Sequence, residues 1–208
     1  MTPPSIAKTR QLPFVTISLI VTHLLLFGYT LTLNVRELAQ FVRQWAILPV
    51  QLFTQFPTEF FTLATAPFIH GSWVHFVSNC LAIAVFGRLV EAHFRPIYTI
   101  FLYFTCAFGA TIAQLLIEPA NATPIMGASG AIAGLLGATI TIPQTRILHS
   151  NLLLLASLWF IMQQLNALLL LEGVQFQLGS SAFFAVAGGF ITSILLGKRL
   201  RMAATINT

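Results

Sequence analysis

The sequence predicts an all-α protein that crosses a lipid bilayer several times. Of its 208 residues, 57% are hydrophobic and only 7% are charged, whereas soluble domains carry about 25% charged residues. The mean hydropathy is +0.86. A water-soluble core could not hide this much apolar surface, and within a bilayer a helix satisfies its own backbone hydrogen bonds. The composition therefore indicates one helical membrane domain, with the lipid bilayer as its solvent.

Six apolar segments are the candidate spans, since a membrane helix takes about 20 residues. They cover residues 13–33, 72–86, 97–117, 124–142, 152–171 and 178–196. A signal peptide would have a shorter apolar core than the first segment and a small-residue cleavage site, so we interpret this segment as a span. The chain then divides into an N-terminal tail (1–12), a six-span membrane domain (13–197) and a C-terminal tail (198–208).

The residues between these segments are more polar. Residues 34–68 are too polar to span the bilayer as a whole but are rich in Phe and Trp, which predicts an amphipathic loop at the membrane interface. The charged cluster that begins at Arg88 and ends at Arg95, with Glu91 and His93 between them, predicts a turn after the second span. The remaining turns are expected at residues 118–123, 145–150 and 172–177.

The distribution of Lys and Arg predicts the orientation, because cytoplasmic loops carry an excess of these residues. With the N-terminus inside, eight basic residues face the cytoplasm and only Arg36 and Arg43 face outward. The eight are Lys8, Arg10, Arg88, Arg95, Arg146, Lys198, Arg199 and Arg201. We therefore expect both termini in the cytoplasm, and the compact six-span form suggests a bacterial inner membrane.

Small residues mark the fourth apolar segment as the central helix. Gly127, Gly130, Gly134 and Gly137 follow one another at spacings of three, four and three, which places them on one helical face. Glycine is costly inside a helix, so such a stripe indicates that other backbones approach closely. Ser129 is expected beside the stripe, near the positive end of the helix dipole.

A polar cluster, His70, His75 and Asn79, lies at the start of the second apolar segment. His75 and Asn79 are four residues apart and so share one helical face. Polar groups at membrane depth are expensive and face a cavity or a partner, so the cluster is either a helix–helix hydrogen-bonding site or a functional one. The two histidines are five apart and no Glu follows the first, so the pattern of a helical zinc protease is absent. The basic residues are scattered, so no nucleic-acid site is predicted. No metal or cofactor site is predicted either.

Together the two clusters resemble the rhomboid family of intramembrane serine proteases. The segment from Phe68 to Asn79 is similar to the family's His-x4-His-x3-Asn signature, and the segment from Gly127 to Gly137 is similar to its nucleophile helix. Weaker matches are the segments from Phe86 to Glu91 and from Ala187 to Phe190. The similarity extends from about residue 45 to 197, while the first span fits by position only.

The resemblance implies a six-helix rhomboid bundle and assigns a role to each residue. Ser129 would be the nucleophile of a serine endopeptidase. His75 and Asn79, with the backbone N–H of Ser129, would form the oxyanion hole, and His70 and Gly127 would support the site. The partner would be a transmembrane helix of another protein, bound within the lipid bilayer and unwound near its outer side.

In the sixth span the sequence differs from the pattern of the rhomboid family. The family carries its general base three residues before a glycine that corresponds to Gly189, and this position is Val186 here. No other alignment supplies the base, because His149 is the last histidine in the chain. About 20 helical residues separate it from Ser129, which amounts to roughly 30 Å.

Two functions therefore compete at this stage. The first is an intramembrane serine protease with low or unconventional activity, in which His75 could substitute as base only by ceasing to be an oxyanion donor. The second is a catalytically inactive rhomboid-like protein, a pseudoprotease that binds transmembrane segments of client proteins. The sequence predicts that proteolysis is low or absent, because a serine hydroxyl without a base is a poor nucleophile.

Overall fold

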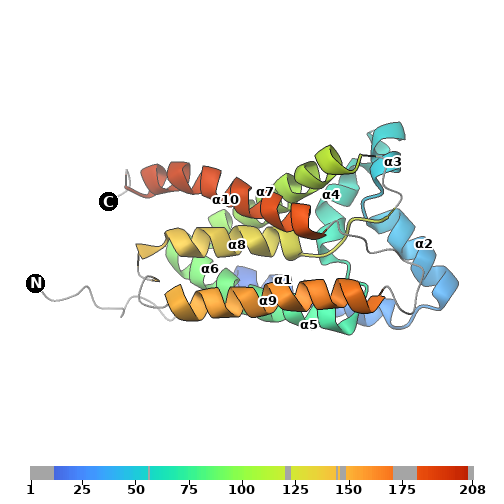
Figure 1. Ribbon diagram of the computed structural model, residues 1–208, viewed down its shortest axis with the longest axis horizontal. Helices are drawn as coiled ribbons and strands as arrows, with labels where there is room; N and C mark the ends of the chain where they lie inside the picture. The colour runs from blue at the N-terminus through green and yellow to red at the C-terminus, as the bar shows by residue number, and fades with distance from the viewer. Residues whose placement is uncertain are drawn as a thin grey trace, which may run out of the picture.

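The computed structural model describes residues 12–55, 57–119, 123–143, 145, 149–170 and 182–205. Within these ranges every regular element is a helix, which confirms the all-α prediction, and the long helices form an elongated bundle (Figure 1). The helices are α1 (Phe14–Thr30), α2 (Val35–Trp45), α3 (Pro49–Thr54), η1 (Thr58–Phe61), α4 (Thr62–Thr65), η2 (Ala66–Phe68), α5 (Trp73–Ala82), η3 (Ile83–Gly87), α6 (Arg88–Phe94), α7 (Pro96–Ile117), α8 (Ser129–Thr141), α9 (His149–Leu170) and α10 (Ala182–Thr205).

Each predicted apolar segment overlaps one apolar helix. Two continuous helices of 22 residues, Trp73–Phe94 and Pro96–Ile117, are long and apolar enough to cross a membrane. Four shorter apolar helices accompany them in the described residues: Phe14–Thr30, Ser129–Thr141, Ser150–Leu165 and Phe183–Gly197. The prediction for the third segment, residues 97–117, agrees with α7 to within one residue.

The turn predicted at residues 88–95 is wrong. The second apolar helix continues through the π-helical turn η3 into α6 and ends at Phe94, where Arg95 takes a φ of 77°. The helix tolerates Glu91 because its buried carboxylate accepts hydrogen bonds from the N–H groups of Val15 and Thr16 and from the Thr16 hydroxyl, at 2.8–2.9 Å. The carboxylate therefore satisfies the N-terminus of α1, and each such charged hydrogen bond is worth about 1.5–3 kcal/mol.

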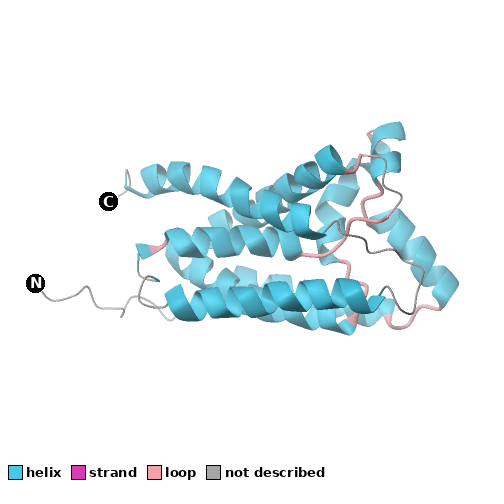
Figure 2. Cartoon of the chain, in the orientation of Figure 1, coloured by secondary structure: helices cyan, strands magenta, loops and turns pink. Residues whose placement is uncertain are grey.

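The region predicted as an amphipathic loop instead contains short helices, in residues 35–54 and 58–68 (Figure 2). Helix α2 begins with a capping box, in which the Asn34 side chain accepts from the Glu37 N–H and the Glu37 carboxylate accepts from the Asn34 N–H. The three-residue spacing of Asn34 and Glu37 was a readable signal for this helix. The region keeps the aromatic exposure expected at an interface, with Phe53 61% and Phe60 52% exposed.

The closest helix packing joins α7, α8 and α10. Methyl groups built at Gly130 and Gly134 would lie 2.2 Å and 2.3 Å from the Cβ atoms of Ala110 and Cys106 on α7. On α10, a methyl group at Gly189 would lie 1.9 Å from the carbonyl oxygen of Gly130. The glycine stripe therefore lets two helices approach α8, whose residues are buried at ten of thirteen positions and which lies between α10 and α9 in Figure 1.

Three predicted boundaries change. Helix α8 begins at Ser129 rather than near Pro124, because residues 124–128 form a loop in which Ile125 makes an isolated bridge with Ile47. Helix α9 already begins at His149, inside the turn expected at 145–150, and α10 continues to Thr205, beyond the expected end of the sixth span. The turn predicted at 172–177 and most of the N-terminal tail lie outside the described residues.

Candidate functional site

Ser129 is the first residue of α8 and is 8% exposed. The residue before it, Ala128, offers no side-chain acceptor to the helix, so the first-turn N–H groups of α8 have no capping side chain. These N–H groups and the helix dipole together favour negative charge at this point. The position suits a hydroxyl whose attack on a carbonyl would generate an oxyanion.

Gly127 does not belong to the helical stripe, which corrects the sequence interpretation. It precedes the helix with a φ of 101° and donates its N–H to the Ala66 carbonyl at 2.9 Å. A methyl group built there would lie 2.4 Å from Cε1 and 2.6 Å from Nε2 of His75. Only glycine therefore permits the His75 ring to lie against the loop two residues before Ser129.

His75 is thereby brought from α5 to the start of α8, as the two sequence clusters suggested. Ser72 caps α5 by accepting the His75 N–H at 3.1 Å, which fixes the first turn of that helix. The imidazole is 8% exposed, and its Nδ1 atom has no hydrogen-bond partner. An unsatisfied buried nitrogen is costly, so this atom is suited to a ligand or a water molecule.

Asn79 lies at the centre of a hydrogen-bond network that also contains His70, Trp159 and Gln163, here called the Asn79 network. Its Nδ2 atom lies 3.0 Å from His70 Nε2. Its Oδ1 atom accepts from the Trp159 indole at 3.2 Å and from the Gln163 amide. All four side chains are buried, and Asn79 is fully so.

His70 connects this network to the loop before α5. Its Nδ1 atom lies 3.2 Å from the Phe68 carbonyl oxygen. Burial lowers the pKa of His70 well below its usual value, and the nearby imidazoles of His75 and His23 lower it further. A neutral His70 with its proton on Nδ1 donates to the Phe68 carbonyl and accepts from Asn79, so this side chain links the loop before α5 to the Asn79 network.

Trp159 and Gln163 were not among the site residues chosen from the sequence, although both donate to Asn79 from another helix. The two residues are four apart on α9 and therefore share a face. A tryptophan one turn before a buried glutamine was the available signal, since an indole N–H that is buried usually finds an acceptor.

His23 completes a row of three imidazoles but is fully buried in contacts of its own. Its Nδ1 lies 2.7 Å from the Leu19 carbonyl oxygen and its Nε2 lies 3.3 Å from the Tyr103 hydroxyl. The ring centroids of His23 and His70 are 5.1 Å apart, and those of His70 and His75 are 4.8 Å apart. These contacts make His23 a hydrogen-bonded packing residue. Within the described residues, no three His, Cys, Asp or Glu side chains form a group that could hold a metal ion.

Val186 lies on the turn of α10 that packs beside Gly130. A methyl group at Gly130 would lie 3.4 Å from the Ala185 carbonyl oxygen, and Gly189 touches Gly130 one turn later. The Val186 side chain is half-buried and lines an apolar groove with Phe183, Ala187 and residues of α8 and α9. This turn of α10 therefore offers no proton acceptor at the level of the Ser129 end of α8.

Comparison with known proteins identifies the family. Residues 57–203 match the Rhomboid domain. RHOMBOID-like protein 6, mitochondrial, from Arabidopsis thaliana is 32% identical over 146 residues, which is 69% of this chain and 45% of the relative. Rhomboid-like protein 11, chloroplastic, from the same plant is 32% identical over 96 residues, or 46% of this chain and 34% of the relative. The chain thus spans less than half the length of these curated relatives. It belongs to the rhomboid family and is an integral membrane protein.

Proposed function

We propose that this rhomboid-family protein retains a serine-protease site that lacks its general base, so that cleavage of transmembrane helices is low or absent. Ser129 is the proposed nucleophile, and His75, Asn79 and the Ser129 N–H are the proposed oxyanion donors. The observation that carries the proposal is the apolar Val186 on the turn of α10 beside Gly130. Loss of the histidine from a serine-protease triad costs about a factor of 10⁶ in turnover.

The proposed site is buried among the helices. Ser129 and His75 are each 8% exposed, and Asn79 is fully buried. An oxyanion hole and binding alone retain roughly 10³–10⁴ over the uncatalysed reaction. Among the described residues at this site, His75 is the group that could substitute as base, because its Nδ1 has no partner. A base at this position would remove a donor from the oxyanion hole, so we assign His75 the donor role.

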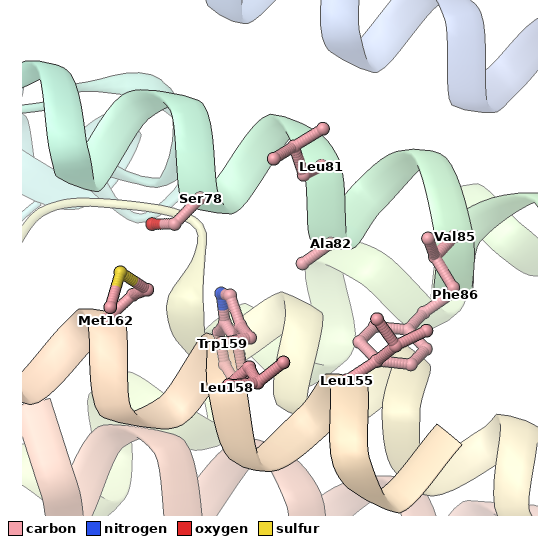
Figure 3. A pocket seen from close by; sticks show the side chains of 9 residues that line it. All are labelled: Ser78, Leu81, Ala82, Val85, Phe86, Leu155, Leu158, Trp159 and Met162. Carbon is pink, nitrogen blue, oxygen red and sulfur yellow. The ribbon is translucent and has the colours of Figure 1, made fainter. Parts of the chain in front are cut away.

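A second candidate is a catalytically inactive protein that binds transmembrane segments of clients. It is favoured by an apolar groove between α5 and α9, whose lining includes Leu81, Val85, Leu158 and Met162 (Figure 3). Ser78 is the one hydroxyl residue among its lining side chains. A groove of this kind is compatible with an apolar helix or with lipid chains, and neither occupant requires catalysis.

We also propose that the chain crosses the membrane six times, with α8 central and both termini in the cytoplasm. The support is the set of six apolar helices and the eight-to-two distribution of basic residues. The bacterial inner membrane rests on the compact form alone, while two relatives are named for plant organelles. A reporter fused after Thr208 is expected to face the cytoplasm, and an outward-facing reporter would refute the proposed topology with both termini in the cytoplasm.

The first test of the missing base is reactivity toward a fluorophosphonate probe, which labels serine hydrolases that activate their nucleophile. We expect Ser129 to resist labelling in membranes, because its hydroxyl has no base. Labelling is measured in gel beside the Ser129→Ala variant and a base-equipped serine hydrolase as positive control. Ready labelling that disappears in Ser129→Ala would overturn the proposal and show that another group activates the serine.

A further inference from the structure

The side chains of α9 fix the direction of the hydrogen bonds that reach the proposed site. The Trp159 indole N–H can only donate. The Asn79 atom that faces it, 3.2 Å away, must therefore be the amide oxygen. Gln163 donates to the same oxygen, so both acceptor positions of the Asn79 amide are occupied from α9.

The other end of the network imposes the same direction. The Phe68 carbonyl can only accept, so His70 carries its proton on Nδ1 and accepts at Nε2 from the Asn79 NH₂ group, 3.0 Å away. If the Asn79 amide were flipped, its oxygen would face the lone pair of His70 and its NH₂ group would face the N–H of Trp159. Both contacts would then be repulsive, in a site where Asn79 is fully buried.

We propose that Trp159 and Gln163 are positioning residues, which act on the Ser129 site only through Asn79. They anchor the amide oxygen on α9, so that one N–H is held on His70 and the second remains to donate to a developing oxyanion. This step rests on the proposed function, because it treats Asn79 as an oxyanion donor. The sequence similarity assigns no role to either residue of α9.

The same two bonds couple α9 to the site. Figure 3 shows Trp159 extending from α9 toward α5, with its indole nitrogen on the α5 side. Two side-chain hydrogen bonds run from α9 to α5, and both end on Asn79 Oδ1. A movement of α9 away from α5 would therefore release the Asn79 amide. The Asn79 N–H donor is held in place only while α9 packs against α5.

The test is nuclear magnetic resonance of the full chain in lipid nanodiscs, with ¹⁵N-labelled asparagine side chains and tryptophan indoles. The Asn79→Leu variant identifies the Asn79 NH₂ signals. In Trp159→Phe and in Gln163→Met, hydrogen exchange of the Asn79 NH₂ group is expected to rise about fivefold, the factor that one net hydrogen bond is worth. Met162→Leu is the matched control, because Met162 adjoins Gln163 on α9. Its side chain lines the groove between α5 and α9 but does not belong to the Asn79 network.

The reciprocal experiment observes Trp159 in variants of Asn79 and also checks that each variant is folded. The Trp159 indole signal is expected to move in Asn79→Leu and to remain hydrogen-bonded in Asn79→Asp, which keeps an acceptor oxygen. The Trp45 and Trp73 indole signals report the fold in every variant. Unchanged Asn79 exchange in both α9 variants, or an equal change in Met162→Leu, would overturn the proposal. These signals do not depend on proteolysis, so they separate this inference from a failure of the proposed function.

Discussion

Replacing Val186 by histidine is expected to raise cleavage of a transmembrane substrate by about 10²–10⁴-fold, the range that a positioned general base contributes. Ala185 and Gly189 both approach Gly130, which is the residue after Ser129. The turn of α10 that carries Val186 therefore lies next to the proposed nucleophile. An imidazole on this turn would supply the proton acceptor that the proposed site lacks. Cleavage is measured in proteoliposomes with a reporter helix that carries a fluorophore on each side of the membrane.

Two matched variants separate catalysis from a change in structure. Val186→Leu should remain at the parental rate, since it changes the shape of the side chain without adding a base. Val186→His combined with Ser129→Ala should be inactive. If the folded histidine variant shows no gain, more than the base has been lost from the site, and the client-binding function becomes the better account.

Gly189→Ala is expected to destabilise the bundle by about 3 kcal/mol or more, the upper range for an overpacked core. The added methyl group would lie 1.9 Å from the backbone carbonyl oxygen of Gly130, which cannot rotate away as a side chain can. Helices α8 and α10 would have to separate, and the first turn of α8 carries Ser129. The measurement is the free energy of unfolding, obtained by adding a denaturing detergent to the protein in micelles of a mild detergent.

Gly28→Ala on α1 is the control for this substitution. A methyl group at Gly28 would meet no atom within 4 Å, and alanine is the better helix former by about 1 kcal/mol. Its stability should equal or exceed that of the parent. Equal unfolding of the two variants would contradict the close approach of α8 and α10.

Several features of the fold were predictable because they depend on composition and local pattern. The apolar segments, the all-helical class and the closely packed glycines of α8 follow from the chemistry of a chain surrounded by lipid. One error arose where a charged side chain has a distant partner. Glu91 suggested a turn, yet it is helical because its carboxylate caps the N-terminus of α1, 75 and 76 residues away in sequence.

The candidate site divides in the same way. Ser129, His75 and Asn79 could be chosen from motif spacing, and Gly127 could be recognised as unusual but not as a residue with positive φ outside the helix. Trp159 could not be assigned to the site, because its hydrogen bond to Asn79 spans 80 residues. The spacing of Trp159 and Gln163 on one face of α9 indicates a buried polar contact, but it does not identify Asn79 as the acceptor.

By itself, the sequence determined the solvent, the helical class, the family resemblance and the absence of any histidine after His149. These properties reside in residue type and short-range order. Only the tertiary structure decided which polar groups meet: Glu91 with α1, His75 with Gly127, and Asn79 with α9. The physical reason is that a buried polar atom must find a partner in space, and the chain that supplies it is fixed by helix packing rather than by sequence distance.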